Sequence, residues 1–117
     1  MTIDEELDKV VDNYKKAKYG KSLIAAYVCP IKYVYHITLV YEEWDDFLEQ
    51  VSKKGLYQYH HGLDVVIHPI KVEDLDIDES NCLSYTYSRI IYDRDNIFGK
   101  YNRSTLARRK KFENKEK

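Results

Sequence analysis

Residues 31–41 alternate between two sets of side chains, and this alternation constrains the fold more than any other feature of the sequence. One set is apolar or aromatic: Ile31, Tyr33, Tyr35, Ile37, Leu39 and Tyr41. The other set is mixed: Lys32, Val34, His36, Thr38 and Val40. Successive side chains of a β-strand point to opposite faces of a sheet, so the period of two predicts a long strand with one face on a core. A first strand is expected over residues 23–29, ending before Pro30 because proline cannot donate to a sheet ladder, and the two strands are close enough to form a hairpin.

Two segments have the period of an α-helix. Thr2-Ile3-Asp4-Glu5 has the form of a capping box and is followed by apolar residues at helical spacing, which predicts a helix that stops at Gly20. Residues 42–54 predict a second helix before Gly55, on the apolar stripe formed by Trp44, Phe47, Leu48 and Val51.

Three more strands are expected over residues 56–61, 63–72 and 83–92, with Gly62 dividing the first two. The last strand alternates Leu83, Tyr85 and Tyr87 with Ser84, Thr86 and Ser88, which suggests a sheet with one face in water. The pattern therefore predicts an α+β domain over residues 1–99, with a small antiparallel sheet of about four to five strands packed against two helices. Residues 100–117 are expected to form a basic tail that is helical or disordered.

The size and composition limit the classes of protein to consider. A chain of 117 residues can bury one core. Its longest apolar run is much shorter than the roughly 20 residues of a membrane span, and its acidic amino terminus is unlike a secretory signal. We expect the two cysteines, Cys29 and Cys82, to be reduced and buried. These observations predict a cytoplasmic protein with no membrane contact.

The charges are segregated along the chain, although the formal net charge is only -1. Residues 42–79 contain eleven acidic residues and three lysines, whereas residues 89–117 contain ten basic and four acidic residues. The acidic side chains of the expected second helix form a candidate partner-binding surface, comprising Glu42, Glu43, Asp45, Asp46 and Glu49. The basic tail is a candidate nucleic-acid-binding segment, comprising Lys100, Arg103, Arg108, Arg109, Lys110 and Lys111.

Tyrosine is the other compositional signal, with twelve residues in the chain. Pairs of the form Tyr-x-Tyr share one face of a strand. Such pairs could contact a protein or stack on single-stranded nucleic acid, or they could serve the core with their hydroxyl groups in water. The candidate aromatic contact surface comprises Tyr57, Tyr59, Tyr85 and Tyr87.

A group of histidines raises the alternative of a metal-dependent nuclease, using His60, His61, Asp64 and His68. Asp64-Val-Val-Ile-His68-Pro69 resembles the Asp-His-Ile-x-Pro core of HNH nucleases over about six residues, although the histidine is displaced and no zinc-binding cysteine pairs surround it. In a strand, Asp64 and His68 would lie about 13 Å apart, too far to share one zinc ion, whose ligands all lie about 2 Å from it. The sequence therefore predicts no metal site and no cofactor.

No phosphate-binding loop, nucleophile elbow or Cys-His catalytic spacing is present in the sequence. The residue usage favours Lys, Ile and Tyr, and in this respect the chain resembles small inhibitor and host-takeover proteins of phages and mobile elements. We therefore expect a non-catalytic interaction protein, an inhibitor or regulator of a protein or protein–nucleic-acid assembly such as a defence nuclease. Direct binding of RNA or DNA through the tail and the tyrosines is the alternative, and the metal-dependent nuclease is the second alternative.

Overall fold

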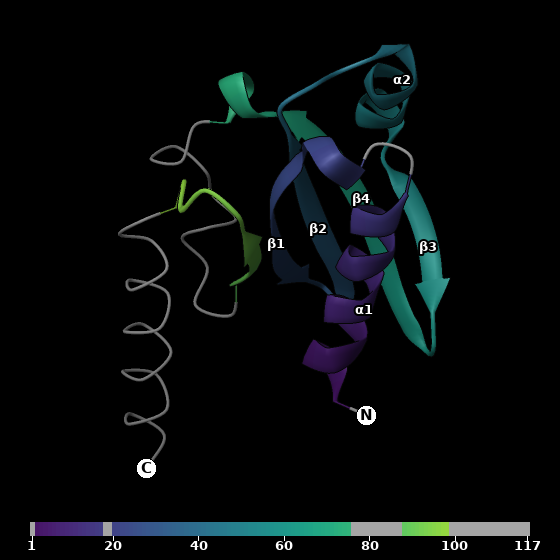
Figure 1. Ribbon diagram of the computed structural model, residues 1–117. Coiled ribbons are helices and arrows are strands. Elements are labelled where there is room, and N and C mark those ends of the chain that lie inside the picture. Colours follow the sequence, from purple (N-terminus) through teal and green to yellow (C-terminus); the bar gives the residue numbers. More distant parts are fainter. Residues whose placement is uncertain (1, 18–19, 76–87, 99–117) are drawn as a thin grey trace.

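Five strands form the sheet seen in the computed structural model, which describes residues 2–17, 20–75 and 88–98 (Figure 1). The elements in chain order are α1 (Ile3–Lys16), the 3-10 helix η1 (Gly20–Ser22), β1 (Leu23–Ile31), β2 (Val34–Tyr41), α2 (Asp46–Lys54), β3 (Leu56–His60), β4 (Leu63–Lys71), the 3-10 helix η2 (Val72–Asp74) and β5 (Arg89–Asp93). The strands lie in the order β3-β4-β2-β1-β5. The α+β class, the number of strands and the two helices are confirmed.

The β1–β2 hairpin is present, but β1 continues through Pro30 to Ile31. The loop consists of Lys32 and Tyr33, both with positive φ, so Ile31 and Val34 form the hydrogen-bonded pair beside the loop. Pro30 is then in the next, non-hydrogen-bonded pair with Tyr35, and its nitrogen faces away from β2. The pairing of β5 with β1 stops at Val28, so the missing N–H group of Pro30 costs no bond to β5. The expected break at Pro30 was therefore wrong by two residues.

The sheet is mixed, which corrects the expectation of a purely antiparallel one. β2 and β4 run parallel, with Val34 opposite Asp64 and Tyr41 opposite Lys71, while the other three pairs of strands are antiparallel. The chain between β2 and β4 contains α2 and β3, which is long enough for the crossover that parallel strands require. The short β3–β4 hairpin then reverses the direction once more.

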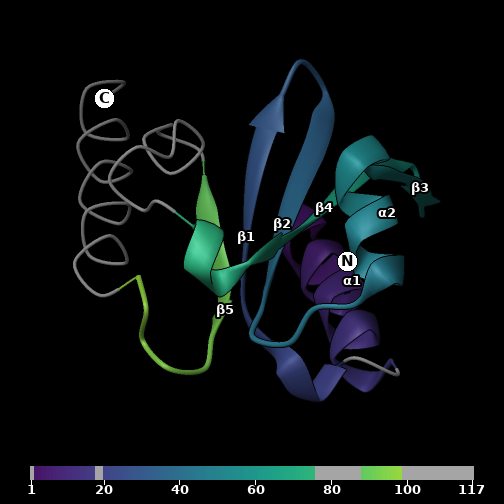
Figure 2. The same cartoon turned by 90° about the horizontal axis from the view of Figure 1, so that it is seen from above.

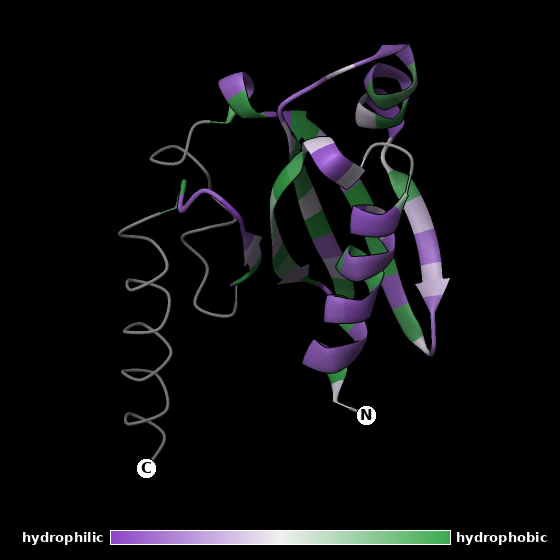
Figure 3. Cartoon of the chain, viewed as in Figure 1, coloured by the Kyte–Doolittle hydropathy of each residue, from purple (hydrophilic) through white to green (hydrophobic). Residues whose placement is uncertain are grey.

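Both helices pack on the same face of the sheet (Figure 2). Leu7, Val10 and Val11 of α1 and Leu48 of α2 join one buried cluster with residues of β1, β2 and β4. Figure 3 shows hydrophobic residues concentrated on β1, β2 and β4, with hydrophilic residues along α1. The helical period therefore identified the inward face of α1, whereas in α2 only Leu48 of the expected stripe is buried, Phe47 is exposed and Trp44 precedes the helix.

One boundary of each helix differs from the expected one: the end of α1 and the beginning of α2. α1 ends at Lys16, with Ala17 extended, and Gly20 lies in the following 3-10 helix instead of terminating α1. α2 begins at Asp46, because the Asp45 carboxylate accepts the Leu48 N–H at 2.9 Å and caps the helix. Glu42, Glu43 and Trp44 therefore precede α2.

The opposite face of the sheet carries a second buried cluster, so the expectation of one wet face was wrong over part of its area. Ile24, Tyr27 and Val40 pack there with Phe98, whose ring meets Tyr27 edge to face at 5.6 Å. The Asp93 carboxylate accepts the N–H groups of Ile97 and Phe98, which holds this segment against the sheet. The alternation of apolar and polar residues in β2 did not reveal this cover, because the covering residues come from distant segments.

Two expectations lie wholly or partly outside the described residues. The last strand is seen as β5, residues 89–93, whereas its expected beginning at 83–87 is not described. The expected tail, residues 100–117, is also outside the described part of the chain. None of the helices that the structure describes is long and apolar enough to cross a membrane.

Candidate interaction surface

β3 is an edge of the sheet, since no described strand lies beyond it. His61 and Gly62 have positive φ and form the two-residue loop to β4, so His60 and Leu63 are the hydrogen-bonded pair beside the loop. Bonded and non-bonded pairs alternate along an antiparallel ladder. The backbone N–H and C=O groups of Tyr57 and Tyr59 therefore point away from β4, toward the open side of the sheet.

The sequence of β3, Leu-Tyr-Gln-Tyr-His, lacks the usual protection of an edge strand. Natural edges are commonly shielded by lysine, proline or a β-bulge, which discourage pairing with another chain. β3 contains no lysine or proline, and its register with β4 is unbroken. It is thus a suitable template for an additional strand.

The side chains of β3 divide between the two faces of the sheet. Gln58 accepts a hydrogen bond from the Tyr14 hydroxyl at 3.2 Å, so the set Leu56, Gln58 and His60 faces the helices. Tyr57 and Tyr59 face the other way, and the Tyr59 residue is 68% exposed. Tyr57 donates a hydrogen bond to Asp64, which raises the pKa of the Tyr57 hydroxyl.

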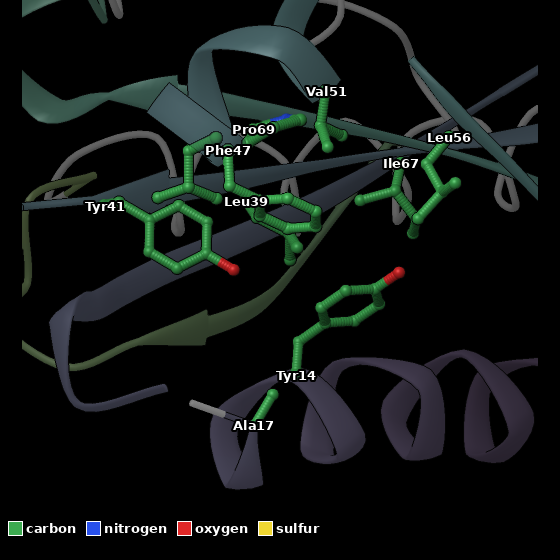
Figure 4. A pocket seen from close by; sticks show the side chains of 10 residues that line it. Tyr14, Ala17, Leu39, Tyr41, Phe47, Val51, Leu56, Ile67 and Pro69 are labelled. Carbon is green, nitrogen blue, oxygen red and sulfur yellow. The ribbon is translucent and has the colours of Figure 1, made fainter. Parts of the chain in front are cut away.

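An apolar pocket of about 490 Å³ lies on the helix side, between α1, α2 and the sheet (Figure 4). Its described lining residues are Tyr14, Ala17, Leu39, Tyr41, Phe47, Leu48, Val51, Leu56, Ile67 and Pro69. Phe47 is 58% exposed and Leu56 is also exposed, so the pocket reaches the surface where α2 adjoins β3. Burial raises the pKa of the Tyr14 hydroxyl, and burial with a smaller contribution from Tyr14 raises the pKa of the Tyr41 hydroxyl to about 12. Both tyrosines are therefore uncharged near pH 7.

The five acidic residues expected on the second helix do not form one free surface. The Glu42 carboxylate pairs with Arg94 at 3.1 Å, and the Glu49 carboxylate accepts the Trp44 indole N–H at 2.6 Å. Asp45 caps α2, whereas Glu43 and Asp46 are exposed. Three of the five therefore have intramolecular roles, so changing the whole set would also disturb folding.

The four residues of the proposed nuclease centre are distributed over three separate contacts. His60 and His61 both meet Glu6 of α1, Asp64 accepts from Tyr57, and His68 lies against His36 of β2. The packing of α1, the antiparallel β3–β4 pairing and the parallel β2–β4 register produce the three contacts in turn. Glu6 is at least 54 positions from His60 and His61, so no local pattern in the sequence indicated this contact. The structure does not assemble the four residues into one centre.

The remaining candidates lie outside the described residues. These are Tyr85, Tyr87 and the basic residues of the tail, Lys100, Arg103, Arg108, Arg109, Lys110 and Lys111. The described half of the aromatic contact surface is therefore Tyr57 and Tyr59.

The His36–His68 pair predicts a pH dependence of stability. The rings stack with centroids 5.3 Å apart, and Nδ1 of His36 lies 3.0 Å from Nε2 of His68. Burial, and then the neighbouring His36, lower the pKa of His68. The unfolded chain, with a histidine pKa of about 6.5, therefore binds this proton more readily than the folded protein, so stability falls as the pH decreases below about 6.5.

We expect urea denaturation midpoints to decrease between about pH 7.5 and 5.5, and His68→Gln to reduce that decrease. His60 and His61 are present in both proteins and do not contact His68, so their contributions cancel in the comparison, and the difference reports the His36–His68 pair. An equal pH dependence in the two proteins would contradict the assignment to His68.

No family model, curated protein or solved structure matched this chain. The fold and the surface features define it as a small α+β domain with a mixed sheet, an open edge strand and an adjoining apolar pocket.

Proposed function

We propose that this protein is a non-catalytic interaction protein that binds an extended segment of a partner protein as an additional strand beside β3. The observation that carries the proposal is the unprotected edge of β3 next to an apolar pocket. Added strands gain affinity from main-chain hydrogen bonds and specificity from pockets for alternate side chains. Tyr57 and Tyr59 supply the outward main-chain groups, and the apolar pocket supplies a site for alternate side chains of the added strand.

The geometry also favours a particular kind of segment. A strand beside β3 would lie about 4.8 Å from it and place alternate side chains on the helix side of the sheet. These side chains would adjoin Leu56 and Phe47, at the exposed margin of the pocket. Side chains on the other face would adjoin the ring of Tyr59. The preferred partner segment is thus extended, with apolar residues at alternate positions.

The residue usage supports a finer form of the proposal, in which the chain is a phage or mobile-element inhibitor or regulator of a protein or protein–nucleic-acid assembly, for example a defence nuclease. Such a protein would act in the cytoplasm of the host cell. Binding at β3 requires no catalytic group.

The proposal is tested by selecting a random peptide library on the immobilised full-length protein. We expect enrichment of peptides with alternating apolar residues, and Tyr59→Pro should weaken their binding by at least about tenfold, because proline removes an outward N–H and blocks approach. Tyr59→Thr is the matched control, since it removes the ring but keeps the backbone donor. It should retain more affinity than Tyr59→Pro.

Circular dichroism and thermal melts of each variant would verify that the fold is unchanged. Equal binding of the selected peptides to Tyr59→Pro and the wild type would overturn the edge-strand proposal. Failure to enrich any peptide, together with salt-sensitive binding of a single-stranded oligonucleotide, would favour the nucleic-acid alternative instead.

A further inference from the structure

Three side chains that can bind metal converge where α1 meets the β3–β4 loop. Glu6 Oε2 lies 2.9 Å from His60 Nε2 and 2.8 Å from His61 Nδ1, and all three donor atoms lie within 4.8 Å of one another. Among the described residues, this is the one group of three or more His, Cys, Asp or Glu side chains whose donor atoms lie close enough together to hold a metal ion. Glu6 is more than 50 positions from the two adjacent histidines, so the folded structure creates the cluster.

The backbone explains how two adjacent histidines reach one carboxylate. His60 is the last residue of β3 and faces the helices, while His61 is in the left-handed conformation at the first loop position. The two rings stack with centroids 4.4 Å apart. As a result, His60 presents Nε2 and His61 presents Nδ1 to the same oxygen of Glu6.

We propose that Glu6, His60 and His61 bind one Zn²⁺ ion. Histidine nitrogen and carboxylate oxygen are zinc ligands at about 2.0–2.2 Å, and tetrahedral ligands at that radius lie about 3.3 Å apart. To admit the ion, the two contacts to Glu6 need to lengthen by about half an ångström, and the two histidine nitrogens, which lie within 4.8 Å of each other, need to come to about 3.3 Å. Zinc would take the place of the protons that now join the imidazoles to the carboxylate.

The burial of the cluster suits three protein ligands and one water molecule. The side chains of Glu6 and His60 are only 12% and 14% exposed, whereas that of His61 is 68% exposed. Two ligands are thus held within the protein and the third borders solvent, which leaves an accessible fourth position. The bound ion would join α1 to the β3–β4 hairpin.

The sequence predicted no metal at His60 and His61 because Asp64 and His68 could not complete the site. Glu6 supplies the missing carboxylate from α1. The inference is independent of the proposed peptide binding, which uses the outward edge of β3 and can be tested without zinc.

The experiment is a calorimetric titration of the tag-free, full-length protein with ZnCl2 at about pH 7.5, a value above the usual histidine pKa. We expect one zinc ion per chain, with affinity reduced at least about tenfold in Glu6→Gln, His60→Gln and His61→Gln. Zinc should raise the melting temperature of the wild type, and chelation should reverse this change. Co²⁺ in place of zinc should give the visible absorption of a tetrahedral site.

His36→Gln and His68→Gln are matched controls, because they remove a histidine from the other close pair, in which the two imidazoles contact each other. Their zinc affinity should equal that of the wild type. Undiminished affinity in Glu6→Gln and His60→Gln, or loss of zinc binding in the His36 and His68 variants, would overturn the proposal. Absence of zinc binding by a folded wild-type protein would also overturn it.

Discussion

Replacing Ile37 by alanine is expected to lower the free energy of unfolding by about 2–5 kcal/mol, the usual loss for a buried isoleucine. Ile37 is fully buried in the central strand β2 and belongs to the cluster that joins the sheet to both helices. Its removal takes away apolar contacts and leaves a cavity among neighbours that cannot fully close it. Urea denaturation followed by circular dichroism measures the loss.

Thr38→Ala is the matched control for Ile37→Ala. Thr38 is the next residue of the same strand, but its side chain points to the opposite face and is only partly buried. We expect a much smaller loss in this variant. If both substitutions cost the same, Ile37 does not have the central place in the core that its burial indicates.

The second large effect is expected at Gly20, where a Cβ atom would lie 1.8 Å from the backbone oxygen of Lys15. Gly20 is buried in η1, and its N–H donates to the Ala17 carbonyl at 2.9 Å. Because the obstacle is backbone of α1, Gly20→Ala must displace the end of the helix or η1. Overpacking of this kind costs about 1–3 kcal/mol, and here we expect the upper end of that range.

The stability of Gly20→Ala should be measured beside that of Lys21→Ala. Lys21 is the next residue and is exposed, so shortening its side chain should have little effect. A Gly20→Ala protein as stable as Lys21→Ala would show that the close approach of η1 to α1 is not needed for folding.

The elements of secondary structure could be predicted from the sequence because each depends on neighbouring residues. The capping threonine at position 2, the stripe ending at Val51 and the alternation in β2 each act within one helix or strand. The positive-φ loop at Gly62 likewise separates β3 from β4 locally. These features indicated the α+β class, the inward face of α1 and most of the element bounds.

The candidate sites were less predictable, because their geometry depends on pairs of distant residues. Tyr57 and Tyr59 could be assigned to one face of a strand, but only the order of the strands makes β3 an edge. Similarly, the acidic residues were visible in the sequence, whereas the pairing of Glu42 with Arg94 required the fold. His60 and His61 were visible, and their carboxylate partner was not.

The sequence by itself therefore determined the local conformations and which side chains share a face of each helix or strand, since these follow from hydrogen bonding and periodicity over a few residues. Only the tertiary structure decided that β2 and β4 run parallel, that Phe98 covers part of the second face, and that Glu6 meets His60 and His61. The physical reason is that strand order and helix placement minimise exposed apolar surface and unpaired backbone over the whole chain, so no short segment encodes them.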